Sequence, residues 1–362
     1  DVQPAGGAGA SQAKTLGESG ISIKQKQWPG KFALDSSEFN DQVVGGKSKN
    51  LELLRGRTPN WIQLPASVAL PFGTFDATLN DPMNAQVKTK LESQILALKQ
   101  FDDSKDGDGF RALIDDIKST ISSLKPPNAL QSELESCFTK EKLSWPGDLE
   151  TSEQGQEAWR TICAVWASKY NERAVLSCKK AGLNHDDLNM AVLCQPVVNA
   201  KYAFVLHTVH PQTNDQTEIY GELVCGMGEA LVGNFAGRAL SFTVKKSDLD
   251  RPTINGFPSK SKGLFARQNT LIFRSDSNGE DLEGFAGAGL YDSVCMNEPS
   301  LESIDYTNEP ISNNEDFRNQ MLSAIAKSGM EIENLLGSAQ DIEGAITEDG
   351  KLFVVQTRPQ VF

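Results

Sequence analysis

The chain has 362 residues and a formal net charge of −13 at pH 7. This length is enough for a large single domain or for two to three lobes with a sizeable core. The negative charge argues against a basic nucleic-acid-binding face, and no apolar run approaches the roughly 20 residues that a membrane span requires. We therefore expect a folded soluble protein with no nucleic-acid or membrane partner. It begins at Asp1 without an initiator methionine, which suggests a piece of a longer protein.

The first half of the chain is predicted to be mainly helical after an unstructured start. Residues 1–27 are rich in Gly, Ala, Ser, Lys and Gln and lack periodicity, which predicts a flexible linker. Residues 43–54 have the pattern of a strand, a glycine turn and a helix, and 68–70 that of a short strand. Apolar residues at helical spacing predict helices across 84–142 and a further long helix over 153–181.

From residue 190 onward the periodicity becomes that of strands. The predicted strands have alternating or continuous apolar residues, and they are the segments MAVLCQPVV, KYAFVLHT, EIYGELV, ALSFTVK and TLIFR. A helix is expected over 315–336, ended by Gly337, and the last two strands flank Asp349–Gly350 as a hairpin.

Cysteine, histidine and tryptophan give no clear site of their own. The six cysteines are scattered without a CxxC pair, which indicates buried free thiols and a reducing compartment rather than zinc or disulfides. None of the three histidines has a serine or cysteine partner in a recognisable pattern. Trp159 and Trp166 share a helix face and are expected in the core, although the five tryptophans could include a sugar-stacking platform.

The C-terminal hairpin carries the most informative pattern. Suppose that Asp349–Gly350 is a two-residue loop; Glu343 then falls opposite Gln356. Asp341 falls opposite Arg358, and because side chains alternate along a strand, all four project from one face. Two acids, an amide and an arginine could hold Mg²⁺ with phosphate oxygens. A cross-strand ion pair on a solvated face is the alternative, and a longer loop would shift the register.

Lys47 is a second candidate. The segment GGKS at 45–48 resembles the end of a P-loop, but Asp41 stands where the full pattern needs a glycine, so this is not a Walker A motif. A strand followed by GGK and a helix can still present Lys47 and backbone N–H groups to phosphates. A solvated lysine beside a turn is the alternative.

A third candidate is the glycine turn at 226–228. It resembles the start of the glycine-rich fingerprint that binds dinucleotides, but Leu231 stands where that fingerprint has its third glycine. Glu229, directly after the turn, could instead lie against a ribose. A plain strand-to-helix turn explains the pattern equally well.

Arg274 is the fourth candidate, at the end of the strand TLIFR. Its guanidinium fork matches phosphate oxygens and stays charged, so it could pair with a phosphoryl group during transfer. Glycines follow at 279, 284, 287 and 289, and such a loop could close over a nucleotide and exclude water. An ordinary surface loop is the alternative.

These four signals fit one ATP–Mg²⁺ site, and longer segments carry a family resemblance. VVGGKSKNLELL, LPASVALPFG, VWASKYNERAVLS, IYGELVCGMGEALVG, FRSDSNGEDLEGFAGAGLYDSV, DIEGAI and VVQTRP together resemble the ATP-binding domain of the pyruvate phosphate dikinase and phosphoenolpyruvate synthase superfamily. The arginine–glycine segment follows GELVCGMGEALVG, an order that resembles the α-glucan, water dikinase branch. The resemblance implies an α+β, ATP-grasp-like domain over 28–362. It would have two lobes, a helical insertion and a lobe boundary near 185–190.

The same resemblance assigns roles to individual residues. Lys47 would contact the phosphates of ATP, Arg274 would hold the phosphoryl group in transfer, and Arg358 would lie on the phosphates. The remaining implied positions bind the nucleotide or its metal: Gln195, Val197 and Val198 beside adenine, Glu229 near the ribose, and Asp341, Glu343 and Gln356 around Mg²⁺.

The resemblance also implies a reaction and partners. ATP would give its β-phosphate to a histidine on a separate domain of the full-length chain, which then phosphorylates glucosyl units of a starch-like α-glucan. The γ-phosphate would pass to water, in a plastid or, where starch is cytosolic, in the cytoplasm. The alternatives are a phosphoglucan, water dikinase or a pyruvate-type dikinase, a noncatalytic adenylate sensor, and a glucan-binding protein that uses exposed tryptophans.

Overall fold

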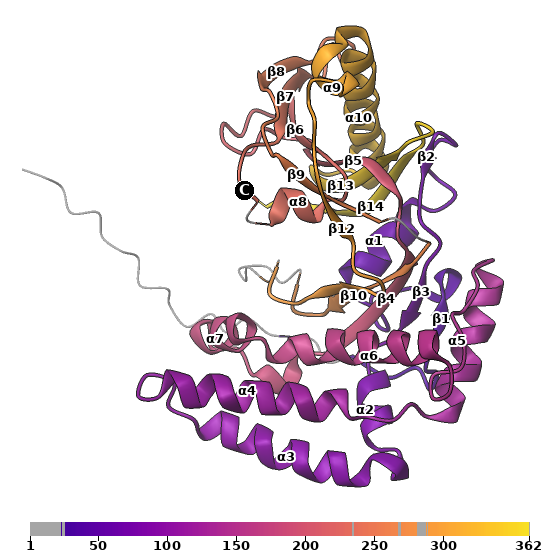
Figure 1. Ribbon diagram of the computed structural model, residues 1–362, viewed down its shortest axis with the longest axis vertical. Coiled ribbons are helices and arrows are strands. Elements are labelled where there is room, and N and C mark those ends of the chain that lie inside the picture. The colour runs from indigo at the N-terminus through magenta and orange to yellow at the C-terminus, as the bar shows by residue number, and fades with distance from the viewer. Residues whose placement is uncertain are drawn as a thin grey trace, which may run out of the picture.

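Two β-sheets form the framework of the molecule (Figure 1). The computed structural model describes residue 23 and residues 26–361, apart from 234, 267–268, 281–286 and 288. The expected linker 1–27 therefore lies largely outside the described residues, as does much of the glycine-rich loop after Arg274.

The first sheet has five strands, and most of the helices pack in the same lobe. Its strands, in spatial order, are β1 (Leu34–Asp35), β3 (Val68–Leu70), β4 (Met190–Pro196), β10 (Leu271–Ser277) and β11 (Ser293–Cys295). The helices of this lobe are α2 (Thr74–Leu79), α3 (Ala85–Gln100), α4 (Gly107–Ser122), α5 (Asn128–Lys140), α6 (Glu153–Ala167) and α7 (Glu172–Ala181). Apolar faces of these helices and of the sheet form one core, in which Trp166 and Phe273 are buried.

The second sheet has seven strands and forms the other lobe. In spatial order they are β2 (Ile62–Gln63), β14 (Leu352–Pro359), β13 (Gln340–Thr347), β5 (Ala200–His207), β6 (Glu218–Cys225), β7 (Leu240–Lys245) and β8 (Thr253–Gly256). Beside it lie a two-stranded sheet and two short helices: β9 (Lys262–Phe265), β12 (Ser300–Ser303), α8 (Glu229–Val232) and α9 (Pro310–Asn313).

Two helices fix the position of the second sheet. α10 (Glu315–Leu336) packs on one face of it, and Gly329 allows this approach because a Cβ there would collide with Leu206 of β5. α1 (Gly46–Leu54) contacts both β14 and β10, so it bridges the two sheets. Leu51 and Leu54 of α1 are buried in the core beneath the second sheet.

Most of the predicted elements are confirmed, with two corrections. Val43 and Val44 form no strand; their amides donate to Asn40 O, so this segment is a turn before α1. The long helix expected over 153–181 is interrupted after α6, because Asn171 leaves the helical conformation and its side chain bonds to Leu290 O.

The lobes are not separated by a single crossing of the chain. The expected boundary near 185–190 falls just before β4, which belongs to the first sheet. The chain then enters the second sheet at β5 and returns to the first at β10. The hinge between β4 and β5 therefore lies where the two sheets meet.

The C-terminal hairpin differs from the prediction at its tip and agrees with it at the candidate site. Thr347 N donates to Lys351 O, so the loop is Glu348–Gly350 and not the two residues expected. A bulge at Val355 then adds one residue to β14. The two changes cancel, and the structure pairs Glu343 with Gln356 as predicted, and Asp341 with Arg358.

Cysteines and helix hydropathy also agree with expectation. All six cysteines, which lie within the described residues, are free thiols; five are buried and Cys295 is half-buried. Among the helices that the structure describes, none is long and apolar enough to cross a membrane.

Gly344 tests the packing beside the bulge. An added Cβ would collide with the ring of Phe204 and lie 2.6 Å from Phe353 O. We expect Gly344→Ala to lower the free energy of unfolding by about 1–3 kcal/mol, as overpacking does. Urea denaturation measures this change.

Gly107→Ala is the matched control, because a Cβ at this exposed helix start meets nothing within 4 Å. Its stability should be unchanged or raised by up to about 1 kcal/mol. Equal stability of the two variants would contradict the close packing at Gly344.

Candidate functional site

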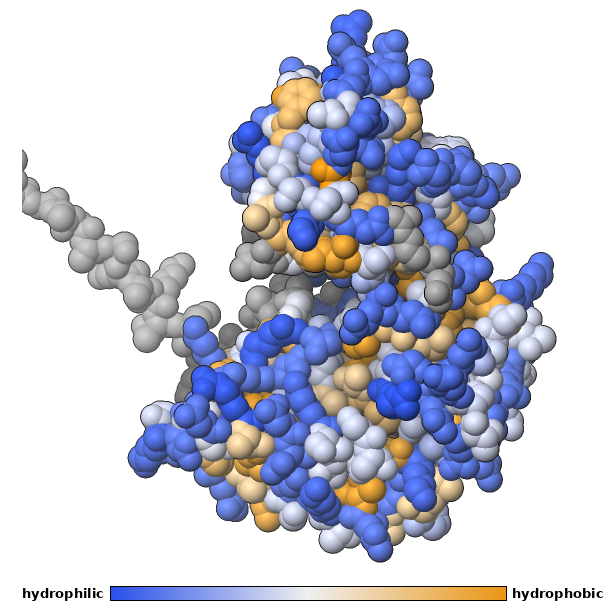
Figure 2. All heavy atoms as spheres, in the orientation of Figure 1, coloured by the Kyte–Doolittle hydropathy of each residue, from blue (hydrophilic) through white to orange (hydrophobic). Residues whose placement is uncertain are grey.

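A cleft of about 550 Å³ lies where the two sheets meet. Its walls come from α1, β4 and β10 on one side and from β5, β13 and β14 on the other, with the turn before α8 at its edge. Figure 2 shows the surface hollowed between the two lobes. A ligand in this cleft would touch segments that are far apart in the sequence.

One end of the cleft is mostly apolar. Gln195 and Val197 of the hinge line it together with Ile272 and Met227. The side chain of Gln195 is buried and donates from Nε2 to Ser67 Oγ at 2.9 Å, which holds the hinge against the segment before β3. A mostly apolar pocket with a few fixed polar groups suits an aromatic ring such as a base. The expected Val198 and Glu229 line the cleft as well.

Arg274 joins the two sheets inside the cleft. It is buried, and its Nη1 donates to Val355 O at 2.7 Å while Nη2 donates to Gln356 Oε1 at 2.6 Å. Nη2 also lies 3.6 Å from Glu343 Oε2. The bulge at Val355 explains the first bond, because the extra residue has no partner in β13 and its carbonyl is left to face Arg274.

The acids of the hairpin are placed differently from each other. Glu343 and Gln356 line the cleft. Asp341 is outside the cleft lining and accepts from Nε and Nη2 of Arg358 at 2.9 and 2.6 Å. Arg358 itself lines the cleft. The ion pair considered as the alternative therefore exists, and it places Arg358 beside Glu343 and Gln356.

Lys47 points into the cleft from the first turn of α1. Its Nζ donates to Ser275 O at 2.8 Å and forms an ion pair with Glu280. Glu280 also accepts from Ser275 Oγ at 2.9 Å and lines the cleft. Burial raises the pKa of Glu280, although the neighbouring Lys47 acts in the opposite direction. A buried carboxylate thus holds the lysine that was expected on phosphates.

Asp276 occupies the N-terminus of α1, where phosphate was expected to meet backbone N–H groups. Its carboxylate accepts from Gly45 N and Lys47 N, each at 2.9 Å, and from Ser48 Oγ at 2.5 Å. Burial raises the pKa of Asp276, against these hydrogen bonds. The start of α1 is therefore capped by β10, which leaves only the side chain of Lys47 free to reach a ligand.

Three of these features were not predicted from the sequence: the carboxylates of Asp276 and Glu280 and the carbonyl of Val355. Asp276 follows Arg274 by two residues, so the alternation of a strand could have placed it on the same side, toward α1. Neither the ion pair of Glu280 nor the bulge has a local signal, because each depends on contacts across the fold.

The geometry favours a polyphosphate ligand with a divalent cation. Arg274, Arg358 and Lys47 bring positive charge to one end of the cleft from three separate elements. Glu343 and Gln356 offer oxygen ligands among them, as a metal bridged to phosphates requires. Within the described residues no group of three or more His, Cys, Asp or Glu side chains could hold a metal alone.

Comparison with known proteins agrees with this geometry. Residues 140–362 match the family model described as pyruvate phosphate dikinase, AMP/ATP-binding domain. The chain is 48% identical over 343 residues to the chloroplastic alpha-glucan water dikinase of Citrus reticulata. The aligned region covers 95% of this chain and 22% of that protein. It is 50% identical over 341 residues to alpha-glucan water dikinase 1 of Arabidopsis thaliana, covering 94% and 24%.

A more distant similarity lies outside these plant proteins. Phosphoenolpyruvate synthase of Pyrococcus furiosus is 26% identical over 195 residues, or 54% of this chain. The chain spans about a quarter of the length of the plant relatives that it matches.

The Lys47–Glu280 pair makes a prediction about nucleotide affinity. The Glu280 carboxylate competes with phosphates for Lys47, so removing its charge should favour binding. We expect Glu280→Gln to lower the Kd for an ATP analogue with Mg²⁺ by roughly threefold to tenfold, the scale of a partly buried ion pair. Isothermal titration calorimetry measures this affinity.

Glu172→Gln is the matched control, since Glu172 is a partly exposed acid paired with Arg111 on the helical lobe. It changes the net charge equally and should leave the Kd unchanged. A weaker affinity in Glu280→Gln would mean that Glu280 supports nucleotide binding and does not compete with it.

Proposed function

Because the chain belongs to the pyruvate phosphate dikinase AMP/ATP-binding domain family, we propose that its cleft binds ATP with Mg²⁺ and directs the β-phosphate to a histidine elsewhere in a glucan, water dikinase. That histidine then phosphorylates glucosyl units of an α-glucan. The sum of the reaction is ATP, glucan and water giving AMP, phosphoglucan and phosphate. The observation that carries the proposal is the convergence of Lys47, Arg274 and Arg358 on one cleft.

The nucleotide would lie along the cleft with its base at the apolar end. Gln195, Val197 and Val198 would border adenine, and Glu229 would lie near the ribose. Lys47 and Arg358 would then contact phosphates at the other end. Arg274 is already held by Gln356, so its guanidinium is preorganised for charge that develops on the transferred phosphoryl group.

The carboxylate and amide of the hairpin fit Mg²⁺. Glu343 is partly exposed in the cleft. Gln356 Oε1 beside it accepts from Arg274 Nη2, so its second lone pair would be the one that faces the cation. Mg²⁺ commonly takes one or two carboxylates together with phosphate oxygens and waters. Asp341 would hold Arg358 in position through their ion pair. The Asp341 carboxylate would bind Mg²⁺ itself only after that ion pair had opened. When bound, Mg²⁺ supplies charge neutralisation for the triphosphate.

The histidines of this chain do not suit the acceptor role. None of the three lines the cleft among the described residues. His185 bonds to Lys169 O at 2.9 Å, and burial lowers its pKa to about 4. His207 and His210 lie at the end of β5 and just beyond it. We therefore place the phosphorylated histidine on another domain, with the linker 1–27 as the connection.

The names of the relatives support the proposed glucan acceptor and the proposed compartment. The plant proteins at 48% and 50% identity are named alpha-glucan water dikinases and chloroplastic, whereas the phosphoenolpyruvate synthase is only 26% identical. These values favour a glucan, water dikinase in a plastid over a pyruvate-type dikinase. Cytosolic starch would place the same activity in the cytoplasm.

Arg274 tests the transfer step. Arg274→Lys keeps a positive charge but loses the fork that spans Val355 O and Gln356. We expect phosphotransfer from β-labelled ATP to a separately supplied phosphohistidine domain to fall by about a hundredfold, with ATP affinity falling only a few-fold. Label on that domain is counted after gel separation.

Arg111→Lys is the control, because Arg111 lies on the exposed surface of α4 and pairs with Asp108. It should transfer label at the unaltered rate. Normal transfer by Arg274→Lys would rule out the proposed role of the guanidinium. Transfer of label to glucan by this chain in the absence of a histidine domain would contradict the proposal that the phosphorylated histidine lies on another domain.

Glu343 tests the metal site. Glu343→Ala removes the cleft-lining carboxylate while leaving the Asp341–Arg358 pair in place. We expect the Mg²⁺ concentration for half-maximal ATP binding to rise about tenfold or more, since few protein ligands hold the cation. Glu348→Ala, at the exposed hairpin tip, should leave it unchanged. Identical Mg²⁺ dependence in both variants would remove Glu343 from the site.

A further inference from the structure

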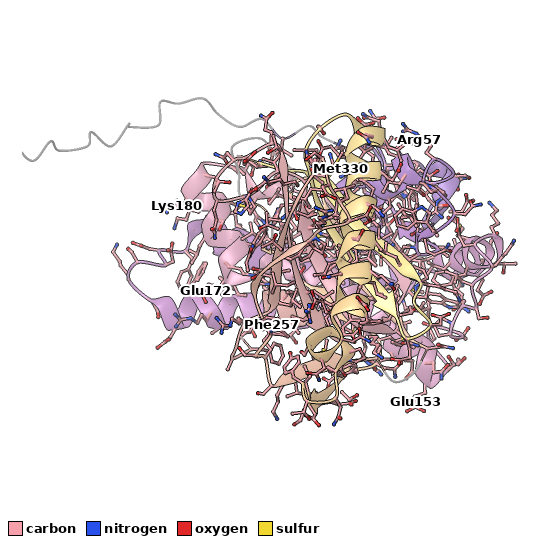
Figure 3. All side chains as sticks on the ribbon, turned by 90° about the horizontal axis from the view of Figure 1, so that it is seen from above. Arg57, Glu153, Glu172, Lys180, Phe257 and Met330 are labelled. Atoms are coloured by element: carbon pink, nitrogen blue, oxygen red, sulfur yellow. The ribbon has the colours of Figure 1, made fainter. Side chains whose placement is uncertain are left out.

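A second hollow, of about 400 Å³, lies along α10 and remote from the nucleotide cleft. α10 covers the face of the second sheet that carries Leu206, whereas the neighbouring Val205 lines the cleft. Because side chains alternate along a strand, the two hollows lie on opposite sides of this sheet. Seen from above, α10 lies over the sheet on the outside of the lobe, with Met330 labelled on it (Figure 3). We call this hollow the α10 groove.

Polar side chains on one stripe of α10 form the wall of the groove. Asp316, Asn319, Gln320 and Lys327 line it, at spacings that bring them to one side of a helix. All four are exposed or half-buried. Amides and carboxylates in a row offer both donors and acceptors to a ligand that lies along the helix.

Asp250 completes the wall from the loop between β7 and β8. Its Oδ1 accepts from Lys327 Nζ at 2.6 Å and from Ser323 Oγ at 2.9 Å. These bonds orient the carboxylate, 74% of whose side chain is exposed to solvent. They also engage Lys327, the cation among the groove-lining residues, so the groove is poorly suited to an anion.

Trp61 supplies an aromatic surface beside these polar groups. It lines the groove, and 44% of it is exposed. Trp159 and Trp166 are buried in the helical core, as expected. Trp28 is equally exposed, but it does not line the groove, and its indole donates to Lys31 O. Trp61 is thus the exposed tryptophan that borders a polar hollow in the described part of the chain.

An aromatic face beside hydrogen-bonding groups suits a neutral polyhydroxylated ligand. A rigid indole provides a large contact area at low entropic cost, and it can cover the apolar C–H face of a pyranose ring. Amides and a fixed carboxylate can bond to hydroxyls at the ring edge. A polyphosphate would instead meet Asp250 and Asp316.

We propose that the α10 groove binds a short stretch of α-linked glucosyl units, separately from the nucleotide cleft. The choice of an α-glucan rests on the proposed function, while the sugar-binding chemistry rests on the groove itself. Such a site would raise the local concentration of polymer near the domain, as a second attachment does in multivalent binding. It would not take part in phosphotransfer.

The test is titration of the 362-residue chain with maltoheptaose, in the absence of nucleotide. We expect saturable binding that Trp61→Ala weakens about tenfold or more, as for removal of an aromatic anchor. Trp28→Ala is the matched control, because it removes a tryptophan with the same 44% exposure and should leave binding unchanged. Gln320→Ala, on the exposed face of α10, is a second groove variant and should weaken binding by several-fold.

ATP binding in the same samples separates this inference from the proposed function. The groove variants should bind ATP normally, which also shows that they are folded. Lack of maltoheptaose binding by the unaltered chain at millimolar concentration would overturn the groove and leave the nucleotide site intact. Equal binding by Trp61→Ala and Trp28→Ala would overturn the assignment, as would preference for a β-linked oligosaccharide. Failure of ATP binding with glucan binding retained would count against the proposed function alone.

Discussion

The arrangement of the cleft depends on Arg274. Its backbone belongs to β10 of the first sheet, and its side chain bonds to β14 of the second sheet. Its guanidinium reaches from β10 to Val355 O and Gln356 of β14 and is largely removed from solvent. A buried cation of this kind is stable only when its donors are satisfied. The bulge in β14 provides one acceptor and the Gln356 amide provides the other. The same bonds therefore join β10 to β14 and place the guanidinium at the cationic end of the cleft.

The two acids near Lys47 have different consequences for ligand binding. Asp276 caps α1 through two backbone amides and Ser48, so its carboxylate is part of the framework. Among the described residues, the Glu280 carboxylate bonds to the side chains of Lys47 and Ser275, and it lines the cleft. We expect that a phosphate in place of Glu280 would leave α1 capped, whereas loss of Asp276 would leave the first backbone N–H groups of α1 without their acceptor. The anion-binding capacity of this end of the cleft thus belongs to side chains and not to a helix terminus.

Local patterns in the sequence predicted most of the longer strands, several of the helices and the pairing of the C-terminal acids, but not the short strands such as β1 and β11. The pairing was correct at the site although the loop was one residue longer than expected, because the bulge at Val355 offset that residue. Alternation and turn chemistry report on neighbours along the chain, so they placed Glu343 opposite Gln356. They could not show that Asp276 reaches Gly45, 231 positions away. The interruption of the helix at Asn171 and the ion pair between Lys47 and Glu280 also depend on residues that are distant in the sequence. Local patterns could therefore not predict them.

The central claim is that ATP spans this cleft with its phosphates among Lys47, Arg274 and Arg358 and with Mg²⁺ at Glu343 and Gln356. A crystal structure of the chain with a nonhydrolysable ATP analogue and Mn²⁺ tests it most directly, because anomalous scattering locates the cation. We predict a Mn²⁺ peak within coordination distance of Glu343 and of phosphate oxygens, with Arg274 in contact with the β-phosphate. A nucleotide bound elsewhere, or a cation with no ligand from the hairpin, would contradict the account.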